Sequence, residues 1–430
     1  MTTTSPSDYP VPKRKAHAVL ALLFLLMAFD FIDRQVLSAL LPAIKADWLL
    51  TDTQLGMLVS AVNVALAILA LPVAVIVDGW SRTRAIGIMS LFWSLATAAC
   101  MFAGNFYHLL IARFAVGVGE AGYGPAGFAL LSGLYPARLR ATVIGIFQSA
   151  NMLGTLVGVM LGGFIAAHWG WRAAFGVVAL PGLLFAILMF FATDYKTTAV
   201  SIRDQQSGMM RNASWKEVLR MLIRSRVLIL LVLGQTAVLF FVSTFGNWLP
   251  SFLHRAHGLP LDKAGLRTGM VLIVVGCGIA LGGWLTDRIV GPHPHRRLYA
   301  AAGLVTVSSS QFVAAFCLPP GTMQMALIFG GAFFMMAMTA PVTSALMEMV
   351  HPGTRSSASG MLITVQNLLG MALGPTIGGI LSDRYDLQTA LLIIAVCPLL
   401  GAVSYVLAGR GYNQARMRLS SDALSAPAMS

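Results

Sequence analysis

Residues 113–127 of this chain read RFAVGVGEAGYGPAG, and they lie within an apolar run from about Tyr107 to Leu134. The run is long enough to cross a bilayer as a helix, which takes roughly 20 residues. It nevertheless carries Arg113 and Glu120, whose spacing places both side chains on one face of a helix. A charged group at membrane depth costs about 2.5–3.5 kcal/mol on insertion scales and is typical of a substrate or proton pathway. The stretch therefore predicts a membrane-spanning helix that carries a functional polar site.

The composition of the chain is that of a membrane protein. It has 430 residues, of which 57% are hydrophobic and only 10% are charged, whereas a soluble protein has about 25% charged residues. The net charge of +13 comes from basic residues that gather in alternate loops, which is the pattern of the positive-inside rule and not of a nucleic-acid-binding face. We expect a multi-pass protein of the plasma membrane, the inner membrane in a bacterium, with both termini in the cytoplasm.

Twelve apolar runs follow one another along the chain and predict an all-α fold of two pseudo-symmetric six-helix bundles. The expected spans are 17–42, 53–77, 84–104, 107–134, 140–167, 172–194, 226–252, 264–289, 297–317, 322–350, 356–382 and 386–408. The expected organisation is a disordered cytoplasmic tail at 1–16, an N-terminal bundle at 17–194, a cytoplasmic linker with an amphipathic helix at 195–225, a C-terminal bundle at 226–408 and a cytoplasmic tail at 409–430.

The two predicted bundles repeat each other in sequence. The polar and small residues of the fifth span recur with one constant offset in the eleventh: Asn151, Gly154, Gly158, Gly162 and Gly163 return as Asn367, Gly370, Gly374, Gly378 and Gly379. Glycines every four residues let neighbouring helices approach closely. Their repetition predicts a duplicated architecture whose halves rock around a site near the membrane midplane.

The first span also carries ionisable residues, Asp30, Asp33 and Arg34, at helical i, i+3, i+4 spacing. Counting along the helices places them at depths comparable to those of Arg113 and Glu120. Two arginines and three acids leave one negative charge in excess, so we expect one proton to be bound to this cluster. Such a site can couple proton binding to a change of state, or exchange the proton for an anionic headgroup on arginine. The alternative is a static ion-pair network that only fixes helix packing.

Two matching loops resemble the signature loop of the major facilitator superfamily. Residues 74–84 read AVIVDGWSRTR and residues 282–297 read GGWLTDRIVGPHPHRR. The second copy fits well, whereas the first departs from the pattern at Ala74, Gly79 and Ser81. The resemblance implies that charge and helix-end contacts hold the cytoplasmic side closed and break on opening. The gating residues would be Asp78, Arg82, Asp287 and Arg288. The alternative is that these are ordinary solvated turn charges.

Within that superfamily the chain is similar to the Spinster-like transporters. The resemblance rests on FIDR at 31–34, Arg113, GEA at 119–121, NWLP at 247–250 and HRAHG at 254–258. The anion:cation symporters share the Asp-Arg and Gly-Glu-Ala features.

The resemblance implies alternating access, proton coupling and an anionic or amphipathic substrate such as a lysolipid. It also implies that Asp33 and Glu120 are protonatable and that Arg34 and Arg113 are their partners and bind the anionic group. Asp30 departs from the asparagine common in relatives and is a further candidate for proton coupling. The second interpretation is a proton symporter for small organic acids, such as sugar acids or aromatic carboxylates.

Uncharged polar residues near the middle of other spans are candidates to line a substrate cavity, although each could equally be a bond between helices. They are Asn63, Tyr123, Gln148, Asn151, Gln235, Thr236, Asn247, Gln366 and Asn367. The predicted interior of the second bundle has no charge and is rich in Met and Phe, which would suit an amphiphilic solute.

Other classes of function are disfavoured by the sequence. The GxGxxG pattern at 117–122 lacks the preceding strand of a dinucleotide site, and the histidines lie at span ends, in loops or in tails. We expect no enzyme activity, metal or cofactor, with only a proton gradient as energy source. The expected partners are the lipid bilayer, protons and a small-molecule or lysolipid substrate, with no nucleic acid. A non-transporting membrane sensor or intramembrane enzyme is the rival class.

Overall fold

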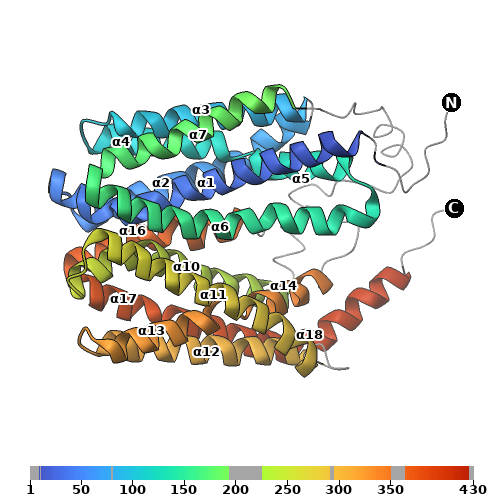
Figure 1. Cartoon of the computed structure of the whole chain (residues 1–430). Helices are drawn as coiled ribbons and strands as arrows, with labels where there is room; N and C mark the ends of the chain where they lie inside the picture. Colours follow the sequence, from blue (N-terminus) through green and yellow to red (C-terminus); the bar gives the residue numbers. More distant parts are fainter. Residues whose placement is uncertain are drawn as a thin grey trace, which may run out of the picture. The chain divides into compact units, whose positions relative to one another are not determined.

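The structure, a computed structural model, describes residues 9, 11–78, 81–192, 225–290, 295–349 and 364–425. Every regular element in these ranges is a helix, so the predicted all-α class is confirmed (Figure 1). Nine of the described helices are long and apolar enough to cross a membrane, and Thr322–Met335 is a shorter apolar helix. The amphipathic helix predicted in the linker lies outside the described residues.

Contacts divide the chain into two compact units, each of which is interrupted in sequence. Unit 1 comprises Met1–Thr197, Gly246–Gly269 and Pro375–Arg384, and unit 2 comprises Thr198–Phe245, Met270–Gly374 and Tyr385–Ser430. The first helices of unit 1 are α1 (Lys13–Trp48), α2 (Asp52–Asp78), α3 (Arg82–Met101), α4 (Phe106–Glu120), α5 (Tyr123–Leu134), α6 (Ala137–Trp169) and α7 (Trp171–Phe190).

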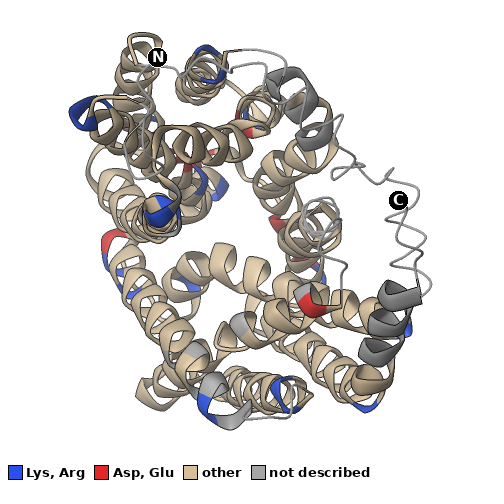
Figure 2. Ribbon diagram, turned by 90° about the vertical axis from the view of Figure 1, so that its right-hand side faces the viewer, with Lys and Arg blue, Asp and Glu red and all other residues tan. Residues whose placement is uncertain are grey.

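Three later helices begin in one unit and end in the other. They are α10 (Arg226–Ala256), α11 (Leu261–Val290) and α16 (Leu373–Arg384). The remaining helices belong to unit 2 and are α12 (Arg296–Cys317), α13 (Thr322–Met335), α14 (Thr339–Glu348), the π-helix η2 (Gln366–Ala372), α17 (Leu387–Ala395) and α18 (Cys397–Ser425). Figure 2 shows how few Lys, Arg, Asp and Glu positions the described helices carry.

The helices at the two ends of the chain are longer than the predicted spans. α1 begins at Lys13, within the tail predicted at 1–16, and α18 continues to Ser425, past the predicted end of the last bundle at residue 408. Lys, Arg, Ala and Leu all have high helix propensity. Helical turns can therefore continue after the apolar part of a span has ended.

The repeated glycines do bring helices close together in each unit. A β-carbon added at Gly158 of α6 would lie 2.7 Å from the carbonyl oxygen of Ile32 in α1. At the equivalent Gly374, it would lie 2.7 Å from the carbonyl oxygen of Phe240 in α10. Both distances are below the normal contact limit, so larger residues would force these helix pairs apart. The same small residue therefore sets the same kind of helix contact in both units.

The fourth predicted span, expected to be one helix over 107–134, is broken in the structure. α4 ends at Glu120, α5 begins at Tyr123, and Ala121 and Gly122 form the turn between them. Pro125 explains the break, because its ring has no N–H to donate to the carbonyl of Ala121 and clashes with that carbonyl in a helix.

The tenth predicted span, expected over 322–350, is broken at the equivalent place. α13 ends at Met335 and α14 begins at Thr339, and Pro341 stands at the same offset from this break as Pro125 from the other. The twelfth span is likewise divided into α17 and α18, with Pro398 beside the division. Periodic hydropathy alone conceals these breaks, because the residues on both sides of each are apolar.

Candidate functional site

Five ionisable side chains meet inside unit 1, and they are the ones predicted to form a cluster. Asp30, Asp33 and Arg34 project from α1, whereas Arg113 and Glu120 project from α4. The three carboxylates and Arg113 are buried. Charges held this far from water require partners of opposite sign. Here two carboxylates share one arginine, and the third carboxylate has an arginine of its own.

Arg34 is shared by two carboxylates. Its Nε donates a hydrogen bond to Asp30 Oδ1 at 2.9 Å, and its Nη2 forms an ion pair with Glu120 Oε2 at 2.9 Å. The contact with Glu120 is an ion pair without good hydrogen-bond geometry, since neither carboxylate oxygen of Glu120 accepts a hydrogen bond. We call Asp30, Arg34 and Glu120 the shared-arginine triad. It contains two acids and one base.

Asp33 and Arg113 form a separate, balanced pair. Arg113 Nη1 lies 3.3 and 3.4 Å from the two carboxylate oxygens of Asp33, and the hydroxyl of Thr97 donates to Asp33 Oδ2 at 2.9 Å. Asp33 therefore has a cation of its own and a second donor, which comes from α3. Sequence reasoning missed Thr97, because a threonine in an apolar helix has no charge to mark it.

The two arginines also differ in access to solvent. The side chain of Arg34 is 21% exposed and that of Arg113 is 1% exposed. Arg34 is therefore the more accessible of the two side chains, whereas Arg113 is enclosed by protein. The guanidinium of Arg34 also makes a cation–π contact with Phe31, at 5.0 Å from the ring centroid.

The uncharged polar candidates are placed in several different environments. Tyr123 is buried and donates to the carbonyl oxygen of Leu23 at 2.7 Å, and Gln235 accepts a bond of 3.3 Å from Tyr405. Tyr123 and Gln235 therefore form hydrogen bonds between helices, which is the alternative to lining a cavity. The hydroxyl of Thr236 is buried without a partner. Of the rest, Gln148 and Asn151 are exposed, whereas the partly buried ones are Asn63, Asn247, Gln366 and Asn367.

The predicted cytoplasmic gate is described only in part. The side chains of Asp78 and Asp287 lie outside the described part of the structure. Arg82 is the first residue of α3, and Arg288 is exposed with its guanidinium 4.6 Å from the ring centroid of Trp284. The gating role of these residues stays a prediction. Among the described residues no group of three or more His, Cys, Asp or Glu side chains could hold a metal ion.

Comparison with known families identifies the chain. The family described as Major Facilitator Superfamily matches residues 23–375. The chain belongs to the major facilitator superfamily. It is a multi-pass membrane transporter and not an enzyme, and its helices have the major facilitator fold, as the sequence predicted.

The relatives of this transporter include both predicted groups. It is 24% identical to a probable L-galactonate transporter of Escherichia coli, over 94% of each chain. It is 28% identical to protein spinster homolog 1 of Bos taurus, over 85% of this chain and 73% of the relative. Among solved structures, a bacterial homologue of the human lysosomal transporter Spinster matches with a TM-score of 0.84 at 22% identity, over 94% of this chain and 99% of the other. The predicted resemblance is confirmed.

Proposed function

We propose that this transporter carries an organic anion together with a proton, and that Arg34 binds the anionic group. The observation that carries the proposal is the shared arginine. Arg34 is the accessible base of the cluster, and two buried carboxylates, Asp30 and Glu120, already compete for it.

Charge balance makes the proton necessary. The pair of Asp33 and Arg113 is neutral, so the excess negative charge of the cluster belongs to the shared-arginine triad. An anion on Arg34 would add a second negative charge in a region where isolated charges are costly. A proton on one carboxylate removes one competitor and leaves the guanidinium free for the anion. Proton and anion therefore bind together, which is the requirement for coupled transport in one direction.

Glu120 is the carboxylate best placed to take the proton. Its oxygens accept no hydrogen bond, whereas Asp30 accepts from Arg34 and Asp33 accepts from Arg113 and Thr97. Glu120 is also the last residue of α4, where the partial negative charge of the helix end disfavours another negative charge. Of the acids predicted to couple protons, we therefore propose Glu120 as the carrier, with Asp30 as its partner. Asp33 has the positioning role.

The solute class that the site supports best is a small organic acid. One partly exposed arginine side chain suits a single carboxylate or sulfonate, and the L-galactonate transporter among the relatives is named for a sugar acid. The second candidate is an amphipathic anion such as a lysolipid. It is favoured by unit 2, in which the charged residues Arg226, Arg297 and Glu348 lie near helix ends.

The proposal is tested by thermal-shift measurements on purified protein at acidic and neutral pH. The probes are sugar acids, short sulfonates and lysolipids, because a ligand that prefers the folded state raises Tm. We expect a shift with sugar acids that is larger at acidic pH and is lost in Arg34→Gln. Arg113→Gln is the matched control, which should lower the baseline Tm but retain a ligand-induced shift. A full shift in Arg34→Gln would contradict the anion site, and a shift with lysolipids alone would favour the second candidate.

A further inference from the structure

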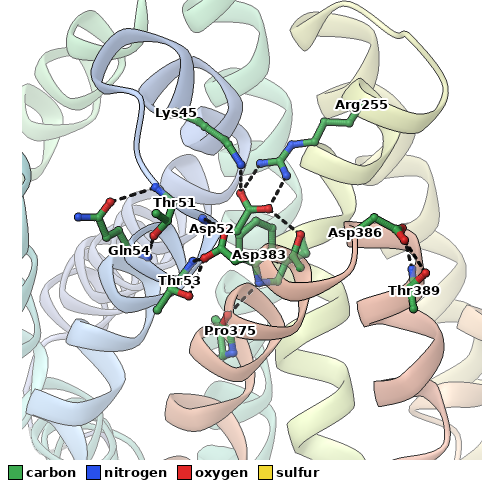
Figure 3. Close-up of polar contacts among 12 residues, drawn as sticks. Lys45, Thr51, Asp52, Thr53, Gln54, Arg255, Pro375, Asp383, Asp386 and Thr389 are labelled. Carbon is green, nitrogen blue, oxygen red and sulfur yellow. Dashed lines mark hydrogen bonds and ion pairs between the residues drawn. The ribbon is translucent and has the colours of Figure 1, made fainter.

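A second polar network in unit 1 surrounds Asp52, the first residue of α2. The Asp52 side chain is only 3% exposed. Its carboxylate accepts from Lys45 Nζ at 2.6 Å, from Arg255 Nη1 and Nη2 at 2.7 and 2.8 Å, and from the Ser382 hydroxyl at 2.6 Å (Figure 3). Bidentate pairs of arginine with a carboxylate are among the strong hydrogen bonds in proteins.

The neighbouring carboxylate of Asp383 caps the start of α2. It accepts from the backbone N–H groups of Asp52 and Thr53 and from the Thr53 hydroxyl, each at 2.7 Å. The first N–H groups of a helix have no partner within the helix, and a capping side chain usually comes from the residue just before it. Here the cap is supplied by α16, which lies more than three hundred residues further along the chain.

Three partners in this network come from the second half of the sequence: Arg255, Ser382 and Asp383. They nevertheless belong to unit 1, together with the first seven helices. Glycines allow this close approach. A β-carbon at Gly56 of α2 would lie 2.4 Å from the carbonyl oxygen of Pro375, and one at Gly379 would lie 2.2 Å from that of Asp52. Helices α2 and α16 therefore lie so close together that neither glycine leaves room for a β-carbon. The charged network joins the same two helices at the start of α2.

We propose that the Asp52 network is a latch on one gate of the transport cycle, at the end of α1 opposite to its start at Lys13. A solute that reaches the cluster from this end must pass while α2 is parted from α10 and α16. Parting them breaks the pair of Asp52 and Arg255 and also removes the Asp383 cap from α2. The latch therefore joins gate opening to the loss of order in the first turn of α2. This inference rests on membership of the major facilitator superfamily. It does not depend on the proposed anion and proton.

A salt bridge near the same end of α1 provides a matched control. Asp47 accepts from Trp171 Nε1 at 3.1 Å and from Arg172 Nη1 at 2.9 Å. Both partners lie on α7, so this pair stays within the first seven helices, and its side chains are 44% and 43% exposed. Its loss should not release α10 or α16.

The first test measures how often the latch opens. Hydrogen–deuterium exchange of the purified protein is followed for the peptide that contains the N–H groups of Asp52 and Thr53. Losing a charged hydrogen-bond partner makes local opening more frequent, so we expect exchange to be at least about tenfold faster in Asp52→Asn and in Asp383→Asn. Asp47→Asn should exchange like the unaltered protein. Equal exchange in all four proteins would overturn the proposal.

The second test locks the latch without removing any of its charges. The hydroxyl oxygens of Ser60 on α2 and Thr376 on α16 lie 2.8 Å apart, so Ser60→Cys with Thr376→Cys places two thiols in bonding distance. The background should have the native cysteines replaced by alanine. Oxidation should slow exchange of the Asp52 and Thr53 amides at least about tenfold, and reduction should restore it. Either single variant is the control. Unchanged exchange after complete oxidation would show that α2 and α16 do not part.

Discussion

Glu120→Gln gives the most direct test of the shared-arginine triad. Glutamine has nearly the shape of protonated glutamate but never ionises. The substitution should therefore fix the site in its proton-bound form and leave Arg34 paired with Asp30 alone. Anion binding should become strong and independent of pH, whereas the unaltered protein should bind tightly only at acidic pH.

The size of the effect follows from the geometry. Glu120 Oε2 lies 2.9 Å from Arg34, and an anion on the same guanidinium would be about 5 Å from that carboxylate. Two unit negative charges at this distance repel by about 3 kcal/mol at an effective dielectric constant of about 20. Since 1.4 kcal/mol is a factor of ten, ionised Glu120 should weaken anion binding about a hundredfold. The affinity of the unaltered protein should fall by up to about tenfold per pH unit until that difference is reached.

The assay has a binding part and a transport part. Kd for the sugar acid that gives the largest thermal shift is measured from acidic to alkaline pH, and proteoliposomes report accumulation driven by a proton gradient. Glu120→Gln should show a flat pH profile and no uphill accumulation, while exchange of labelled for unlabelled solute continues. Glu348→Gln is the control, because that carboxylate is bonded to Arg297 and Tyr412 in unit 2. A Glu120→Gln protein that accumulates solute normally would refute the proton-carrier role.

Two further predictions concern single hydrogen bonds. Thr97→Val removes the hydroxyl donor to buried Asp33 and should cost about 1–3 kcal/mol of stability, measured by thermal unfolding. The pH profile of anion binding should not change, because Thr97 and Asp33 lie outside the shared-arginine triad. An altered profile would contradict that placement. Asp386→Ala removes the cap of α17, formed by the bonds to Thr389, and should cost up to about 1 kcal/mol at neutral pH. Burial alone would raise the pKa of Asp386, but the hydrogen bonds from Thr389 outweigh it and lower that pKa. The stabilisation is therefore present above about pH 4, the ordinary range of aspartate, and is lost as the pH falls further. The Tm values of the two proteins should converge in acid, and a constant difference would show that the cap does not depend on ionisation.

The sequence was sufficient to find the cluster but not its internal pairing. Ionisable residues inside apolar runs are rare enough to be conspicuous, so the five members could be predicted. Spacing along α4 places Arg113 and Glu120 on one face, yet they contact different residues of α1. The rotation of each helix and the rotamer of each long side chain decide which charges meet, and neither follows from hydropathy. Thr97 could not be distinguished from a packing residue for the same reason.

The helix breaks could have been predicted, because Pro125 and Pro341 stand at one offset in the two halves. The Asp52 network could not. Lys45, Asp52 and Arg255 lie at span ends, where isolated charges are usually solvated. Only the approach of α16 to α2, hundreds of residues apart, shows that Asp52 is buried and that Asp383 is a cap. Gly379 was predicted to pack helices as part of the glycine repeat, but its partner was unknown, and Gly56 lies outside that repeat.

The two polar networks of unit 1 differ in charge balance, and this difference separates their roles. The Asp52 network contains two acids, Asp52 and Asp383, and two bases, Lys45 and Arg255. It is complete without a proton or a solute, so its strength can set how often the gate opens without responding to either. The shared-arginine triad has one base for two acids, so it is complete only after a proton has bound. Coupled transport needs both kinds of site. A balanced network alone would let the gate open whether or not a solute is bound. An unbalanced site alone would not keep the gate closed. Separate variants at Asp52 and Glu120 should therefore alter gate opening and pH dependence independently.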